Sequence, residues 1–148
     1  MQKTIFSDTG WRVDDIPPRF SGVYEKTRPN RNGWKWRSVL AQAADQEYIF
    51  LTQVHEQRDN WSAWLILKNE GGASIVDRFE YHGSHPGLHI HAHCERGGIE
   101  EGPSSINDLV RFPKASSRHR RLQTYRPASF WEQARSHFRI DYPRGALL

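Results

Sequence analysis

Five of the eight histidines of this chain fall within twelve residues, between Tyr81 and Cys94. They are His82, His85, His89, His91 and His93. Side chains of a β-strand alternate between its two faces, so the last three are predicted to share one face of a strand. Imidazole titrates near neutral pH and is also the commonest protein ligand of metal ions. The cluster therefore predicts either proton transfer or metal binding.

Cleavage of RNA by proton transfer needs a base for the 2′-hydroxyl, an acid for the leaving 5′-oxygen and a cation for the phosphate. We expect His89 and His91 to form the acid–base pair, with His93 as a third member or as a residue that orients its neighbour. Phosphate stabilisation is expected from Arg96 and Arg78. The residues expected to bind substrate are His82, His85, Tyr81, Arg118, Arg120 and Arg121.

Metal binding is the alternative, because alternate positions on a strand lie roughly 6.5 Å apart and two imidazoles can reach one ion. The pair would be His89 with His91, or His91 with His93, and a further ligand would come from His55, His82 or Glu95. The spacing Gly83, His89, His91, Glu95, Gly102 resembles the first cupin motif. This resemblance implies a divalent metal such as Fe, Mn or Zn on His89, His91 and Glu95. The second cupin motif is absent downstream.

A second resemblance covers residues 78–109. The matching positions, in order, are Arg78-Phe79-Glu80, His85-Pro86, His91-x-His93 and Pro103-Ser104. They resemble the C-terminal half of TumE-family toxins of toxin–antitoxin systems, although the contiguous histidine pair of that family is replaced here by alternation. The resemblance implies a small bacterial toxin-like protein acting on RNA. The preferred hypothesis is thus a metal-independent endoribonuclease, and a non-enzymatic nucleic-acid or protein binding module is a further alternative.

Charge and composition limit the partners and the location. The formal net charge is +4 and the isoelectric point about 9.5, and residues 114–126 are basic, which favours RNA or an acidic antitoxin-like protein as partner. A single cysteine rules out an intramolecular disulfide and the usual thiolate cages of structural zinc. No apolar run is long enough to span a membrane. We therefore expect a cytoplasmic protein without obligatory structural zinc.

The expected fold is α+β in a single domain. Residues 1–33 are predicted to form an irregular arm with a short strand near Phe20–Tyr24, because residues 8–33 are rich in proline, glycine, arginine and asparagine. Residues 34–94 are predicted to form an antiparallel meander of four or five strands. Its strands are expected at 34–41, 47–55, 61–68, 74–82 and along the histidine run. Residues 95–148 are expected to be a loop and two helices, at 104–111 and 129–139, that pack on one face of the sheet and leave the other face to the histidines.

Overall fold

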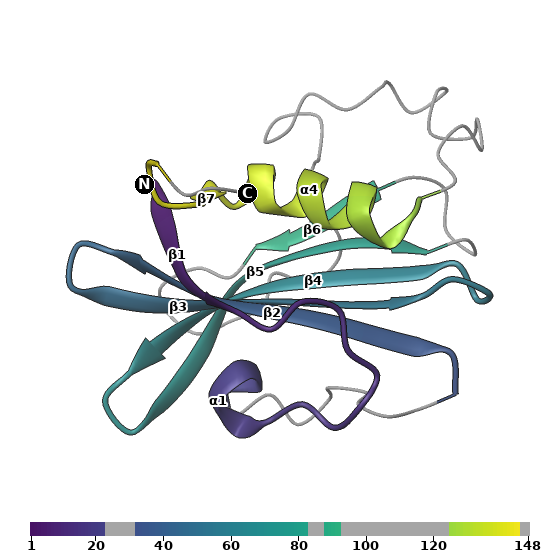
Figure 1. The fold of residues 1–148 in the computed structure, drawn as a ribbon, viewed down its shortest axis with the longest axis horizontal. Coiled ribbons are helices and arrows are strands. Elements are labelled where there is room, and N and C mark those ends of the chain that lie inside the picture. Colours follow the sequence, from purple (N-terminus) through teal and green to yellow (C-terminus); the bar gives the residue numbers. More distant parts are fainter. Residues whose placement is uncertain (23–31, 83–87, 93–124, 146–148) are drawn as a thin grey trace.

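The computed structural model describes residues 1–22, 32–82, 88–92 and 125–145, with residues 82 and 88–92 described through their backbone (Figure 1). Its centre is a seven-stranded sheet in the order β6-β5-β4-β3-β2-β1-β7. The strands are β1 (Lys3–Asp8), β2 (Trp34–Ala43), β3 (Gln46–His55), β4 (Asn60–Asn69), β5 (Gly72–His82), β6 (Leu88–Ala92) and β7 (Ile140–Asp141). The helices are α1 (Pro18–Ser21) and α4 (Pro127–His137).

The predicted meander is confirmed, since β2 to β6 pair in sequence order and every pair is antiparallel. These strands are rich in β-branched and aromatic residues, which fit a pleated, half-buried surface. The turns between them contain residues with positive φ, at Ala44 (53°), Asp59 (49°) and Gly71 (80°). The α+β class holds, with one described helix on each face of the sheet. No helix in the described ranges is long and apolar enough to cross a membrane.

The prediction for the N-terminal arm is wrong in two respects. Residues 3–8 form β1, which pairs antiparallel with β2 and parallel with β7, so the sheet is mixed. Phe20 lies in α1, where the expected strand would begin, because Pro18 occupies the first helical position that proline favours. Of the two expected C-terminal helices, the second is confirmed as α4, whereas residues 104–111 lie outside the described residues.

β1 lacks the hydrophobic pattern expected of a strand because one of its buried positions holds a lysine, Lys3. Lys3 is 7% exposed, and its ammonium group donates hydrogen bonds to the carbonyls of Met1 (3.1 Å) and Phe138 (2.8 Å). The Phe138 carbonyl lies at the C-terminal end of α4, where a cation is favoured. Burial lowers the pKa of Lys3, and the charge of Arg139 lowers it further. Lys3 thus donates a hydrogen bond to a carbonyl at the C-terminal end of α4, from a strand position that an apolar residue would normally occupy.

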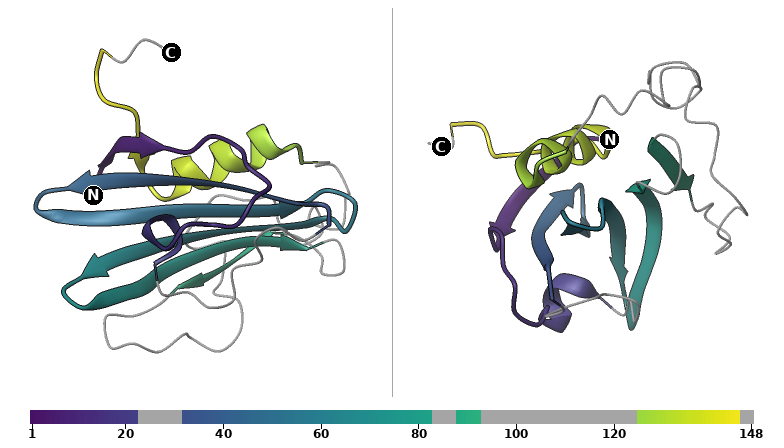
Figure 2. Two further views of the ribbon diagram at one scale, coloured as in Figure 1. Left: turned by 60° about the horizontal axis from the view of Figure 1, so that its bottom comes forward. Right: turned by 90° about the vertical axis from the view of Figure 1, so that its right-hand side faces the viewer.

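The sheet carries a core on each face, and Figures 1 and 2 show α4 over one face and α1 over the other. On the α4 face, the helix contributes Phe130, Trp131, Ala134 and Phe138 to a core with residues of β1 to β5. These positions follow helical spacing, as the sequence predicts. On the α1 face, Trp36, Leu40, Ile49, Leu51, Trp64 and Ile66 form the second core with Ile16.

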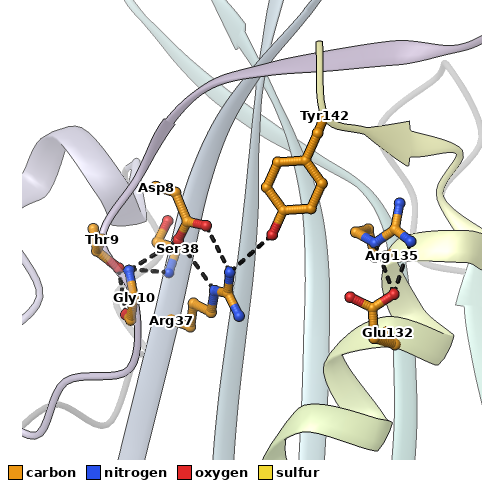
Figure 3. Close-up of polar contacts among 8 residues, drawn as sticks. All are labelled: Asp8, Thr9, Gly10, Arg37, Ser38, Glu132, Arg135 and Tyr142. Carbon is orange, nitrogen blue, oxygen red and sulfur yellow. Dashed lines mark hydrogen bonds and ion pairs between the residues drawn. The ribbon is translucent and has the colours of Figure 1, made fainter. Parts of the chain in front are cut away.

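A half-buried arginine of β2, Arg37, joins β1, α4 and the segment that follows β7, and Figure 3 shows its contacts with Asp8 and Tyr142. Arg37 donates from Nε and Nη2 to the carboxylate of Asp8, at 3.1 and 2.6 Å, and from Nη2 to the hydroxyl of Tyr142 at 3.0 Å. Its guanidinium lies 3.6 Å from the ring centre of Trp131. Burial lowers the pKa of Arg37, but hydrogen bonding to Asp8 raises it and the net direction is upward. These contacts fix β1 against α4.

Candidate acid–base site

The register of the last strand pair brings two histidine positions beside an ion pair. Position 91 pairs with Arg78 and position 89 pairs with Glu80. Directly paired positions of an antiparallel ladder share a face of the sheet. The Arg78 Nε lies 2.9 Å from Glu80 Oε1, and the two side chains are 22% and 10% exposed. Positions 78, 80, 89 and 91, which we call the β5–β6 block, therefore combine a guanidinium and a carboxylate with two histidine positions.

The neighbouring residues of β5 show which face this is. Phe79 packs on α4, with its ring centre 5.8 Å from that of Phe130 and 5.2 Å from that of His137. Asp77 Oδ2 lies 3.1 Å from His137 Nε2. Because side chains alternate along a strand, Arg78 and Glu80 belong to the face away from α4. That is the face on which the sequence analysis expects the histidines.

A row of buried polar residues crosses the sheet toward position 89. Gln53 of β3 pairs with Ser62 of β4, which pairs with Glu80 of β5, which pairs with position 89 of β6. Gln53, Ser62 and Glu80 are 1%, 5% and 7% exposed. In the adjacent row, Trp64 pairs with Arg78. Buried polar groups are costly unless they are hydrogen-bonded. Their alignment on one register row places buried polar residues next to the block, on the face of the sheet that carries the α1-side core.

His55 has a structural role on this face. Its Nε2 lies 3.0 Å from the carbonyl of Asn32, and its Nδ1 accepts a hydrogen bond from the backbone N–H of Arg58 at 3.1 Å. An Nδ1 acceptor and an Nε2 donor define a neutral imidazole whose two nitrogen atoms both have backbone partners. A metal ion on His55 would have to displace one of them, so His55 is a poor candidate for the further ligand of the metal alternative.

Gly33 permits the contact between His55 and the turn before β2. Its φ is +85°, and a Cβ there would lie 2.5 Å from His55 Nε2. We expect Gly33→Ala to destabilise the protein by roughly 2–4 kcal/mol, because a left-handed residue with a side chain is strained and the imidazole must also move. Chemical denaturation measures this loss.

Gly71→Ala is the matched control, since its φ is +80° and nothing lies within 4 Å of the added Cβ. It reports the backbone strain alone and is expected to cost less than Gly33→Ala. Equal losses for the two variants would contradict the steric role of Gly33.

The structure separates one expected residue from the block. Tyr81 lies on the α4 face, where it packs against the first core with its ring centre 5.3 Å from that of Tyr125. His82 occupies a β5 position that pairs with Asn60. The other expected residues lie outside the described residues, namely His85, His93, Glu95, Arg96, Arg118, Arg120 and Arg121. Among the described side chains, no group of three His, Cys, Asp or Glu residues could hold a metal ion.

Glu80 is the residue that sequence reasoning passed over as a functional group. It enters the sequence analysis only as the third residue of the Arg-aromatic-acidic match at positions 78–80. Its signal is its place two residues from Arg78, which puts both on one face of a strand. The pairing of Glu80 with position 89 depends on the register between β5 and β6, which only the structure supplies.

Comparison of the chain with protein-family models, with curated proteins and with solved structures finds no match. The resemblances to TumE-family toxins and to the first cupin motif therefore rest on the residues quoted for them. The β5–β6 block is the part of the described chain whose chemistry bears on function.

Proposed function

We propose that this protein cleaves RNA without a metal ion, by proton transfer at the β5–β6 block. The observation that carries the proposal is the Arg78–Glu80 ion pair, which lies in register with positions 91 and 89. Metal-independent cleavage of RNA needs groups that accept and donate protons, and it needs a cation near the phosphate. His89 and His91 are the candidate proton-transfer residues, with His93 as a third.

Arg78 is the candidate for phosphate binding. Its ion pair with Glu80 is at Nε, and its two Nη atoms carry four N–H donors in a planar fork that suits phosphate oxygens. The side chain is 22% exposed, so the positive group reaches the surface of the sheet beside position 91. Arg96 is a second candidate for this role from the sequence.

The same ion pair favours proton transfer over the metal alternative. A guanidinium 2.9 Å from the carboxylate of Glu80 occupies an oxygen that a divalent cation would otherwise use. The positive charge of Arg78 would also repel a metal ion bound to the same carboxylate. The cupin-like set of His89, His91 and Glu95 would have to form next to this cation.

The charge of the chain supports RNA as the substrate. A net charge of +4 favours an anionic partner, and the basic residues 114–126 would add contacts to the phosphate backbone. Taken with the resemblance to TumE-family toxins, we propose a ribonuclease of toxin type. Its protein partner would then be an acidic, antitoxin-like protein.

Metal removal tests the proposal directly. With an end-labelled RNA oligonucleotide and excess EDTA, we expect the cleavage rate to stay within about twofold of the rate without chelator. The products should carry 2′,3′-cyclic phosphate and 5′-hydroxyl ends, and an all-2′-deoxy oligonucleotide of the same sequence should stay intact.

Two results would contradict the proposal. Cleavage that is lost with EDTA and restored by Fe, Mn or Zn would favour the metalloenzyme. Salt-dependent binding of RNA without any cleavage would leave only a binding module.

A further inference from the structure

We infer that Glu80 is the group that accepts the 2′-hydroxyl proton, which leaves proton donation to the strand-borne histidines. This inference rests on the proposed cleavage of RNA and names the base within that site. It starts from the pairing of Glu80 with position 89 and from the ion pair that holds its carboxylate.

The distances across the ladder suit a pair of groups that act on one phosphodiester. Directly opposed residues of an antiparallel pair have Cβ atoms about 4.5–5.5 Å apart. Two side chains that start at that separation can reach the attacking and the leaving oxygen of the same phosphate. Position 91 pairs with Arg78, the next pair on the same face, so the strand positions of all four residues are neighbours.

The carboxylate is held in place before substrate arrives. Arg78 Nε contacts Oε1 at 2.9 Å, and the Glu80 side chain is only 10% exposed. Ser62 is its register partner on the other side, in β4. A base whose orientation is fixed by its surroundings loses little entropy in the transition state.

A carboxylate and an imidazole also divide the roles of base and acid more clearly than two similar imidazoles. In model peptides the pKa values of Glu and His are about 4.3 and 6.5. At a pH between these two values, the carboxylate is ionised and the imidazole protonated in most molecules. With two imidazoles of equal pKa, the state in which a given one is protonated and the other is neutral is populated in at most about a quarter of molecules. When the pKa values of two groups in an active site differ, the group with the lower value acts as the base and the other as the acid.

The reaction balances without a further reagent. The 2′-oxygen attacks phosphorus as its proton passes to Glu80. The bond between phosphorus and the 5′-oxygen breaks as a histidine, with His89 the nearest by register, gives its proton to that oxygen. The products are a 2′,3′-cyclic phosphate and a 5′-hydroxyl, and Arg78 balances the charge on the phosphate oxygens.

Glu80→Gln tests the base. Glutamine has nearly the size and shape of glutamate, so the packing around position 80 is kept while proton acceptance is lost. We expect the single-turnover rate to fall roughly 10²–10⁴-fold with RNA affinity unchanged. Glu47→Gln is the matched control, because it removes a half-exposed carboxylate paired with Lys68 and should leave the rate unchanged.

A substrate with sulfur in place of the leaving 5′-oxygen separates base from acid. A thiolate leaves without protonation, so the defect of His89→Ala should be largely relieved on this substrate, whereas that of Glu80→Gln should persist. Relief of the Glu80→Gln defect would make Glu80 the acid and overturn the inference. Cleavage by Glu80→Gln within about threefold of wild type, with His89→Ala and His91→Ala inactive, would overturn it and leave the proposed function standing.

Absence of cleavage by the wild-type protein would remove the inference together with the proposed function. If Glu80→Gln fails to fold, the wild-type pH–rate profile decides, because a carboxylate base sets the acidic limb well below the limb of an imidazole base. An acidic limb in the imidazole range would then count against Glu80.

Discussion

Replacement of His89 or of His91 by alanine is expected to slow RNA cleavage roughly 10²–10⁴-fold, which is the usual contribution of a positioned proton-transfer group. Both positions belong to the β5–β6 block, in register with Glu80 and Arg78. The melting temperature of each variant is measured alongside, so that loss of the fold is told apart from loss of a proton-transfer group. RNA affinity should also be nearly unchanged, because phosphate contacts rather than imidazoles supply it. Single-turnover cleavage and filter binding on the same preparations measure the two effects.

His137→Gln is the matched control for these histidine variants. His137 lies on the opposite face, on α4, with Nε2 3.1 Å from Asp77 Oδ2. A glutamine amide can keep a hydrogen bond to that carboxylate, so cleavage should be retained. Equal loss of cleavage in His137→Gln and His91→Ala would show that the block has no special role. Loss in His91→Ala through unfolding would be seen as a lower melting temperature.

Phe130→Ala is expected to destabilise the protein by about 3–5 kcal/mol, the range for removal of a large aromatic side chain from a core. Phe130 is fully buried at the centre of the α4 face. Its ring centre lies 5.3 Å from that of Tyr125, 5.7 Å from that of Trp61 and 5.8 Å from that of Phe79. Alanine would leave a cavity among rings from β4, β5 and the segment before α4 that cannot close without moving the helix. The melting temperature should fall by roughly 10 °C or more.

Ser136→Ala provides the comparison on the same helix, since Ser136 is exposed and close to the C-terminal end of α4. It should change stability by less than about 0.5 kcal/mol. A Phe130→Ala loss of a similar small size would mean that α4 does not pack on the sheet as described. Denaturant titration followed by tryptophan fluorescence is suited to both variants, because Trp61 and Trp131 lie in this core.

The meander could be predicted from the sequence because its signals are local. Runs of β-branched and aromatic residues mark β2 to β5, and the turns at Asp59 and Gly71 separate them. β1 could not be predicted, since Lys3 is buried only through its bonds to backbone carbonyls around the end of α4. β7 has two residues and exists through its parallel pairing with Lys3 and Thr4. Both strands depend on contacts between segments far apart in the chain.

The candidate site was only half predictable for a related reason. The histidines stand out by composition, but their neighbours depend on register, and a shift by one residue would exchange the faces. The ladder between β4 and β5 is interrupted by a bulge, where Leu65 pairs with Asp77 but Ile66 with Ile75. Ile75 therefore packs on the α1-side core, whereas Asp77 contacts α4. Strict alternation along residues 74–82 would have put both on one face.

The position of β6 in the sheet bears on how the protein would respond to mild stress. It has five residues and stands at one end of the strand order, with β5 as its neighbour. Short edge strands open at a lower free energy than a central core, in fluctuations that leave the remaining structure intact. Backbone amides of β6 should then exchange with deuterium before those of β3 and β4. Such sub-global opening would part positions 89 and 91 from Glu80 and Arg78, so catalytic competence would disappear below the global melting temperature and return on cooling.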